Sequence, residues 1–258
     1  MITHGICHLT VVPLRKEASH QSEMVSQILF GEHFEVIEKL GDWYRVVVAY
    51  DHYQGWVLAS QFLPIDYAEF NSLNNEPCCV SFDIVQLMFH DDTVYNIVLG
   101  SSLPHFKEKT CRLGSTAYRF EGSVKCPEKL LRTQGIIENA YMYLNSPYLW
   151  GGRTHFGIDC SGLSQMVYKL AGIRLKRDAW QQAEQGSLVH LVDEARPGDL
   201  AFFDNEEGRI THVGIVLSGG KIIHASGKVR IDSLDHHGIF NNDTKRYSHR
   251  LRLIKRFV

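Results

Sequence analysis

The sequence predicts an α+β protein in which one or two small β-barrels precede a domain of helices packed on an antiparallel sheet. Residues 1–64 contain short apolar runs separated by turn residues at intervals of about 8–12 residues, which is typical of a small barrel. Residues 65–125 show this pattern less clearly, and we expect a second, degenerate barrel there. Residues 126–258 begin with apolar residues at helical spacing and continue as alternating strands.

The composition excludes several classes of protein. Of the 258 residues, 44% are hydrophobic, which allows a sizeable buried core. The net charge of −2 gives no general attraction to nucleic acid or to an anionic membrane. No apolar run approaches the roughly 18 residues of a membrane span, and the first residues lack the pattern of a secretory signal. We therefore expect a cytoplasmic protein without nucleic-acid or membrane partners.

The first barrel is predicted from four strands. They are expected at residues 25–30, 34–40, 43–49 and 55–58. Trp43 and Trp56 are interpreted as barrel core, because large aromatic side chains dominate small cores. The stretches Leu14-Arg15, Gly31-Glu32, Gly41-Asp42-Trp43-Tyr44-Arg45-Val46 and Gly55-Trp56-Val57 resemble bacterial SH3-like domains. In the second stretch, strands are expected at residues 94–99 and 116–120.

Six cysteines stand at positions 7, 78, 79, 111, 126 and 160. The expected lack of a signal and the core-sized chain favour reduced thiols over disulfides. Cys78 and Cys79 would point to opposite faces of a strand, so burial is favoured over a metal or redox site. A zinc ribbon is unsupported because the sequence has no Cys-x-x-Cys pair.

The third stretch is predicted to begin with helices and to end with strands. Helices are expected at residues 128–144, from Asp159 to Gly172, and at residues 179–185, followed by strands at 200–203, 212–217 and 221–225. Asp159 is a good N-cap, which places Cys160 in the first turn of its helix. There the helix dipole and unpaired N–H groups favour a thiolate, the nucleophilic form of cysteine. The flanking Gly and Ser residues favour a reactive cysteine over a buried structural one.

Two histidines on neighbouring strands are the candidate base and its orienting partner. The alternation of residues 212–217 turns His212 away from the neighbouring apolar side chains, and Gly214 leaves room beside its ring. Ser218-Gly219-Gly220 turns the chain back toward His224. A hairpin with an odd loop places both histidines on one face, within reach of a hydrogen bond, whereas an even loop separates them. His236, His237 and His249 match no standard metal-ligand spacing and are interpreted as solvated.

Residues 135–256 resemble the NlpC family of papain-like bacterial cell-wall cysteine peptidases. The resemblance is carried by Tyr148-x-Trp150-Gly151-Gly152, Asp159-Cys160-Ser161-Gly162, Arg196-Pro197-Gly198-Asp199-Leu200, His212-Val213-Gly214-Ile215 and His224-Ala225. It implies a papain-like catalytic domain in which Cys160 is the nucleophile, His212 the base and His224 the orienting residue. It implies no metal and no organic cofactor.

The same resemblance implies groups that contact the substrate. Tyr148 matches a family tyrosine whose hydroxyl, with the Cys160 backbone N–H, would stabilise an oxyanion. Asp159 and Ser161 flank the nucleophile and are further candidates for shaping the oxyanion and substrate site.

The barrels and Arg177-Asp178-Ala179-Trp180-Gln181 together resemble γ-D-glutamyl-L-diamino acid endopeptidases, also called dipeptidyl-peptidase VI. In that group an aspartate matching Asp178 and a glutamate of the first barrel hold the free amine of L-Ala. Glu23 is the candidate glutamate, and Tyr53 is a candidate helper. The alternatives are that Asp178 only caps the helix at residues 179–185 and that Glu23 is an exposed loop carboxylate.

The resemblance implies hydrolysis of the bond between γ-D-Glu and the diamino acid (meso-diaminopimelate or Lys) in murein peptides, releasing L-Ala-D-Glu, by a monomeric cytoplasmic enzyme of peptide recycling. Two alternatives stay open. The domain is an inactive wall-binding module, against which the intact Cys160, His212 and His224 set argues. Or it is an amidase or acyltransferase, although the related lipid acyltransferases resemble a permuted fold with histidine before cysteine.

Overall fold

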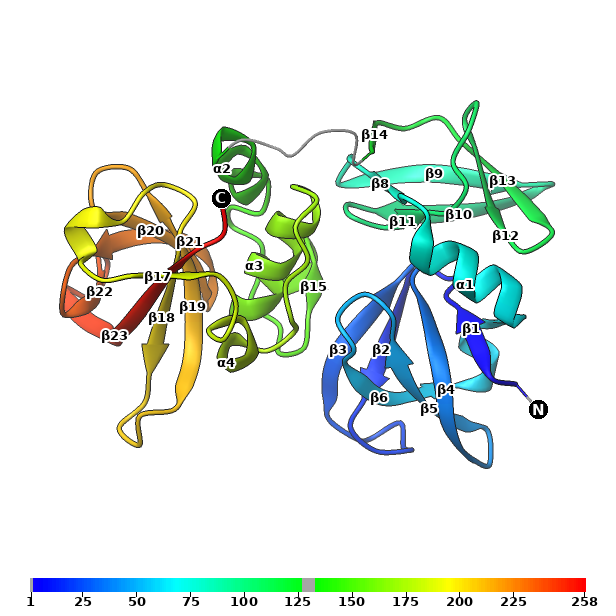
Figure 1. The fold of residues 1–258 in the computed structure, drawn as a ribbon, viewed down its shortest axis with the longest axis horizontal. Coiled ribbons are helices and arrows are strands. Elements are labelled where there is room, and N and C mark those ends of the chain that lie inside the picture. Colours follow the sequence, from blue (N-terminus) through cyan, green and yellow to red (C-terminus); the bar gives the residue numbers. More distant parts are fainter. Residues whose placement is uncertain (1, 127–132) are drawn as a thin grey trace. The chain divides into compact units, whose positions relative to one another are not determined.

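The computed structural model describes residues 2–126 and 133–258. The chain divides into two compact units, Met1–Lys129 and Leu130–Val258 (Figure 1). Each unit has its own sheets and its own core. Among the described residues, none of the helices is long and apolar enough to span a membrane.

The first part of unit 1 is a seven-stranded antiparallel sheet in the order β3-β2-β6-β5-β4-β1-β7. Its strands are β1 (His4–Ile6), β2 (Val11–Arg15), β3 (Met24–Leu29), β4 (His33–Leu40), β5 (Trp43–Val48), β6 (Gln54–Leu58) and β7 (Leu63–Ile65). The four strands expected from the sequence are all present, within two residues at each end. Alternate residues of β2 and β5 are buried, as in a strand with one face on a core.

The interpretation of Trp43 and Trp56 as barrel core is wrong. Both side chains are only partly buried, whereas their chain neighbours Tyr44 and Val57 lie in the core. Since side chains alternate across a strand, burying Tyr44 and Val57 puts both tryptophans on the opposite face. Trp56 instead lines a surface pocket of unit 1.

The second part of unit 1 contains one helix and two small sheets, ordered β10-β9-β13-β12 and β11-β8-β14. The elements are α1 (Tyr67–Asn75), β8 (Cys79–Ser81), β9 (Val85–His90), β10 (Thr93–Val98), β11 (Ser102–Leu103), β12 (Thr110–Leu113), β13 (Thr116–Phe120) and β14 (Val124–Lys125). The two parts share a core, because Ile6 and Phe30 pack in one cluster with Leu73, Met88 and Phe120. A second SH3-like barrel in this stretch stays a prediction.

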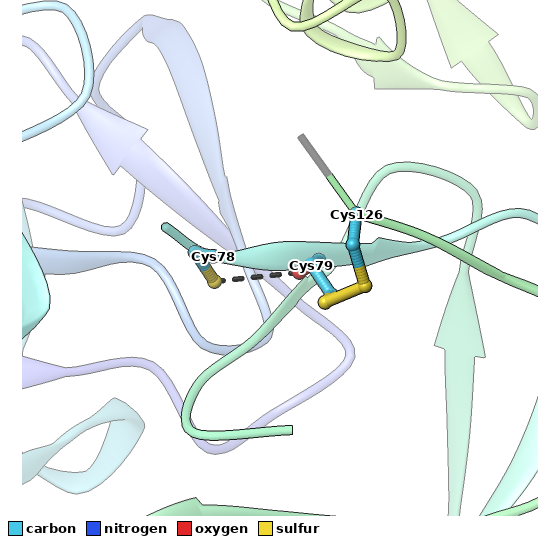
Figure 2. The surroundings of a disulfide bond; sticks show 3 residues. All are labelled: Cys78, Cys79 and Cys126. Carbon is cyan, nitrogen blue, oxygen red and sulfur yellow. Dashed lines mark hydrogen bonds between the residues drawn. A yellow bond between two sulfur atoms is a disulfide. The ribbon is translucent and has the colours of Figure 1, made fainter. Parts of the chain in front are cut away.

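A disulfide joins Cys79 to Cys126 in this unit (Figure 2). Its Cα atoms are 4.0 Å apart, since Cys79 precedes and Cys126 follows the β8–β14 pair formed by Val80 and Lys125. The prediction of reduced thiols is therefore wrong for this pair, because strand pairing brings together cysteines that are 47 positions apart in sequence. Cys78 takes no part in this disulfide and donates from its Sγ to the Cys79 carbonyl at 3.3 Å.

Removing this disulfide should destabilise unit 1. A cross-link over a segment of this length lowers the entropy of the unfolded chain, which is worth about 2–4 kcal/mol. We therefore expect the Cys79→Ser/Cys126→Ser double variant to unfold at lower urea concentration than the wild type, with Cys78→Ser as the matched control. Titration of six free thiols in denatured, unreduced protein would contradict the disulfide.

Unit 2 begins with helices and a short hairpin. The elements are α2 (Thr133–Met142), β15 (Arg153–Thr154), β16 (Gly157–Ile158), α3 (Cys160–Lys169) and α4 (Ala179–Gln182). The expected start of the first helix at residue 128 lies outside the described residues. Asp159 caps α3 as expected, by accepting a hydrogen bond from the Gly162 N–H at 2.7 Å.

The rest of unit 2 is a closed antiparallel barrel. Its strands are β17 (Ser187–Val189), β18 (Leu200–Asp204), β19 (Ile210–Leu217), β20 (Lys221–Ser226), β21 (Lys228–Leu234), β22 (Gly238–Asn241) and β23 (Arg246–Arg256). The sheet order is β17-β23-β18-β19-β20-β21-β22, and a further β22–β23 pairing closes the strands β18 to β23. Closure removes the free edges that an open sheet would present.

The two faces of this barrel have different neighbours. The inward side chains, among them Phe203, Val216, Ile222 and Ile239, form the barrel core. Helices α2, α3 and α4 gather on one outer side, where α3 packs on β19 and β20 (Figure 1). This packing brings the first turn of α3 against β19.

Candidate active site

Cys160 lies at the N-terminus of α3 and is 6% exposed. Its Sγ lies 4.0 Å from the Thr211 carbonyl oxygen and accepts a hydrogen bond from the Val213 backbone N–H. The sulfur is therefore held against the strand on both sides of His212. The structure thus brings the predicted nucleophile next to the residue predicted as its base.

Asp159 fixes the loop that carries the nucleophile. One carboxylate oxygen accepts from the Gly162 N–H, and the other accepts from the Gly151 N–H at 2.8 Å. Arg177 donates to both oxygens, at 3.0 and 2.6 Å, and also to the Ser161 hydroxyl at 2.9 Å. All three side chains are buried, so Asp159 and Ser161 act here as anchors of the loop. Their contact with substrate stays a prediction.

Arg177 is a site residue that the sequence reasoning did not single out. Burial alone would lower the pKa of this guanidinium, but the charge and hydrogen bonds of Asp159 outweigh burial and raise it. The cation neutralises a carboxylate that would otherwise oppose a thiolate at Cys160. The signal for Arg177 in the sequence was its position directly before Asp178, in the stretch from which only the aspartate was taken as a site residue.

The two predicted histidines meet as the odd loop requires. Three residues, 218–220, connect β19 to β20, and Gly214 pairs with His224. His212 is two residues before Gly214 on the same face, and its Nε2 lies 2.9 Å from Nδ1 of His224. A Cβ added to Gly214 would lie 2.7 Å from Cδ1 of Ile222 and 2.9 Å from the His224 Cβ, so a side chain at this position would crowd the strand that carries His224. A bulge at Thr211 directly precedes His212, as often occurs beside active sites.

The hydrogen-bonded chain continues beyond His224. Nε2 of His224 lies 3.0 Å from Oδ2 of Asp232, a residue with no exposed surface. Arg230 donates to both oxygens of the same carboxylate, at 2.7 and 3.0 Å. The sequence reasoning missed both residues. The sequence signal for Arg230 and Asp232 was a pair of opposite charges two positions apart, in the strand that directly follows the one carrying His224.

This chain fixes which nitrogens carry protons. Burial would raise the pKa of Asp232, but hydrogen bonds from His224 and Arg230 hold it well below its ordinary range. An ionised carboxylate only accepts, so His224 carries its proton on Nε2 and accepts at Nδ1. His212 then donates from Nε2, which leaves its Nδ1 with a lone pair. That nitrogen is the base available to Cys160.

Burial acts against charge on both members of the Cys160–His212 pair. It raises the pKa of the Cys160 thiol to about 12, with a further contribution from the Asp159 charge. It also lowers the pKa of His212 well below its ordinary value, and the neighbouring His249 and His224 act in the same direction. That the helix dipole and unpaired N–H groups favour a thiolate at Cys160 stays a prediction, and burial acts against it. Nucleophilic attack therefore needs the Cys160 proton to pass to the His212 ring.

His249 is a correction to the sequence prediction in this site. It is partly buried, and its ring stacks on His212 with centroids 4.0 Å apart and planes inclined by 21°. The interpretation as a solvated side chain is wrong because β23 closes the barrel against β22 and β18. His236 and His237 are exposed, as expected.

The remaining candidates occupy distinct places. Burial, with the charges of Cys160 and Asp159, raises the pKa of Tyr148 to about 12, so its hydroxyl stays a donor near the nucleophile. Asp178 is the N-cap of α4, and its N–H donates to Oε1 of Gln181 at 3.1 Å. Glu23 and Tyr53 line one pocket of about 510 Å³ in unit 1.

Comparison with known proteins agrees with this site. Residues 145–247 match the NlpC/P60 family, and residues 14–62 match the bacterial dipeptidyl-peptidase Sh3 domain. A γ-D-glutamyl-L-lysine dipeptidyl-peptidase of Bacillus subtilis is 32% identical over 217 residues, which cover 78% of this chain and 71% of the relative. The chain belongs to the NlpC/P60 family. It is a cysteine peptidase.

Other NlpC/P60 relatives extend over more of the chain. Dipeptidyl-peptidase 6 of Lysinibacillus sphaericus is 27% identical, with 89% of this chain and 92% of the relative covered. The crystal structure of an NlpC/P60 family protein from Bacillus cereus superposes with a TM-score of 0.83 at 19% identity, over 98% of this chain and 99% of the other. The papain-like α+β fold class with SH3-like strands before it is thus confirmed.

Proposed function

We propose that this peptidase hydrolyses the γ-D-glutamyl–diamino acid bond of murein peptides that have a free N-terminal L-Ala, releasing L-Ala-D-Glu. The observation that carries the chemistry is the hydrogen-bonded chain from His212 through His224 to Asp232, with the Cys160 sulfur held against Thr211, the residue next to His212. The specificity is supported by the dipeptidyl-peptidases that resemble both units of the chain. An intact nucleophile and base argue against an inactive wall-binding module.

In the proposed reaction the Cys160 sulfur attacks the γ-carbonyl carbon while its proton passes to Nδ1 of His212. The resulting oxyanion accepts hydrogen bonds from the Tyr148 hydroxyl and the Cys160 N–H. His212 returns the proton to the leaving amine, and a thioester of the dipeptide remains on the sulfur. Water, deprotonated by His212, then hydrolyses the thioester and restores the thiol.

We propose that recognition of the free amine of the substrate determines which peptides are cleaved. A buried ammonium needs a carboxylate partner, and Asp178 and Glu23 are the two proposed here, with Tyr53 as a helper. Asp178 directly follows Arg177, which is bonded to the loop of Cys160, so its backbone is tied to the reacting centre. In unit 1, Glu23 pairs with Lys16 at 3.2 Å.

Blocking the amine tests this recognition. We expect N-acetylation of L-Ala-γ-D-Glu-diaminopimelate to lower kcat/KM about 100-fold, because the acetylated peptide leaves carboxylates without their cation. In Asp178→Asn the free and acetylated peptides should be cleaved at more similar rates, whereas the exposed control Asp193→Asn should keep the wild-type ratio. Mass spectrometry of the released dipeptide gives both rates. If the wild type cleaves both peptides at equal rates, recognition of the amine is contradicted, but the peptidase activity is not.

The proposal includes cytoplasmic recycling by a monomer. A demand for a free L-Ala amine suits peptides already released from the glycan strands. Size-exclusion chromatography decides the oligomeric state, and cell fractionation decides the compartment. Whether Cys79 and Cys126 are free thiols or a disulfide in intact cells is an independent measure of the compartment. A reducing compartment keeps such cysteine pairs as free thiols.

A further inference from the structure

The barrel interior beside His212 holds a third imidazole that the reaction above does not use. The His249 ring covers one face of His212 and lies edge-on to His224, with centroids 5.8 Å apart and planes at 82°. Phe203 packs against both His212 and His249, at 5.8 and 6.0 Å. The base is thus enclosed by aromatic rings from strands β18, β20 and β23.

A shared metal ion is the first role to consider for three clustered histidines. One ring nitrogen from each of His212, His224 and His249 lies within 4.8 Å of the others. A metal binds in the plane of an imidazole, along the lone pair of the nitrogen. The planes of His212 and His249 are nearly parallel, so their lone pairs run side by side and do not converge. The geometry therefore favours stacking over coordination.

We propose that His249 is a positioning residue for His212, and that its stacked ring holds the base in the plane that aims Nδ1 at Cys160. The inference rests on the cysteine-peptidase chemistry proposed above. Within residues 2–126 and 133–258, the His212 ring has one side-chain hydrogen bond, at Nε2, and that bond by itself does not fix the tilt of the ring. The flat face of His249 removes this freedom on one side, and Phe203 limits it further.

Two bulges place His249 there. The pairing of β23 shifts register at Ser248 against β22 and again at Arg252 against β18. Each extra residue inverts the alternation of side chains, so the position cannot be assigned to a face from the sequence alone. The Ser248 hydroxyl lies 2.8 Å from Nδ1 of His249 and anchors the ring.

The ring is neutral in the resting enzyme. Burial, with a smaller contribution from His224, lowers the pKa of His249 to about 4, against the opposing charge of Asp232. The titratable or charged groups around it are His212 on β19, His224 on β20, and Asp232 with Arg230 on β21. While it is uncharged, this ring does not repel an imidazolium on His212, whereas a protonated His249 would lower the pKa of His212.

Three substitutions test the proposal. His249→Phe keeps a flat, uncharged ring, and we expect its kcat to stay within about threefold of wild type. His249→Ala removes the ring and should lower kcat about 10-fold to 100-fold with little change in KM. Water admitted beside His212 should also move the acid limb of the kcat/KM profile up toward the ordinary histidine value of about 6.5. His249→Leu fills the volume without a flat face and should behave as His249→Ala.

The exposed His237→Ala is the matched control, and thermal denaturation checks that each variant is folded. If His249→Ala does not fold, the comparison of His249→Leu with His249→Phe decides. Wild-type kcat and pH profile in His249→Leu would overturn the proposal, as would an equal loss in His249→Phe and His249→Leu. The pH dependence of Cys160 alkylation by iodoacetamide, followed by mass spectrometry of its peptide, gives the same test even if the tripeptide is not the substrate.

Discussion

Replacing Cys160 by alanine should abolish cleavage of L-Ala-γ-D-Glu-diaminopimelate, with a loss in kcat of about 10⁴-fold or more. The sulfur forms the thioester in the proposed reaction, so its removal leaves His212 without the thiol that it deprotonates in the first step. The substitution removes one atom from a buried position and leaves the cap and salt bridge of Asp159 in place. Mass spectrometry of the released dipeptide measures the loss.

The matched control is Cys78→Ala, which removes the thiol of a unit 1 cysteine that is outside the disulfide. It should retain wild-type activity, and both variants should unfold at about the wild-type temperature. Cleavage by Cys160→Ala at the normal rate would show that another group is the nucleophile.

Replacing Asp232 by asparagine should lower kcat about 100-fold to 1000-fold, although Asp232 does not approach the sulfur. The asparagine amide can donate to Nε2 of His224, which moves the proton of that ring to Nδ1. His224 then donates to Nε2 of His212, and the proton of His212 moves to the nitrogen that should receive the Cys160 proton. The comparable Asp→Asn change in the trypsin triad lowers kcat about 10⁴-fold by the same tautomer argument.

The control for this variant is Asp235→Asn, the same chemical change three residues along the chain. Asp235 contacts His237 and Tyr247 and has no bond to the catalytic histidines. It should keep activity within about twofold, as expected for a surface change. Wild-type kcat in Asp232→Asn would show that the carboxylate does not set the tautomer of His224.

The catalytic pair was predictable because its signals are local. An N-cap next to Cys160 and an odd hairpin loop between His212 and His224 follow from short stretches of sequence, and the structure has both. The strand positions on either side of that loop were predicted for the same reason. The role of Asp232 was missed because its contact with His224 depends on the register between β20 and β21. No turn signal in the sequence sets this register.

The failures share a cause in contacts between distant residues. His249 reaches His212 only through two bulges and the closure of the barrel. The Cys79–Cys126 pair depends on the pairing of β8 with β14. Burial of Cys160, which raises the pKa of its thiol and so acts against the helix dipole, comes from packing of α3 on β19. Residue type and spacing do not determine any of these.

Barrel closure by β23 has a consequence for the order of synthesis. The ribosome delivers Cys160, His212 and His224 before it delivers the strand that seals the barrel. A nascent chain that has not reached Arg246 therefore carries the nucleophile and the base on an open sheet, with β18 and β22 each lacking a neighbour. The His249 ring and the last neighbours of β18 and β22 are therefore added only with β23, after the nucleophile and both catalytic histidines have been synthesised.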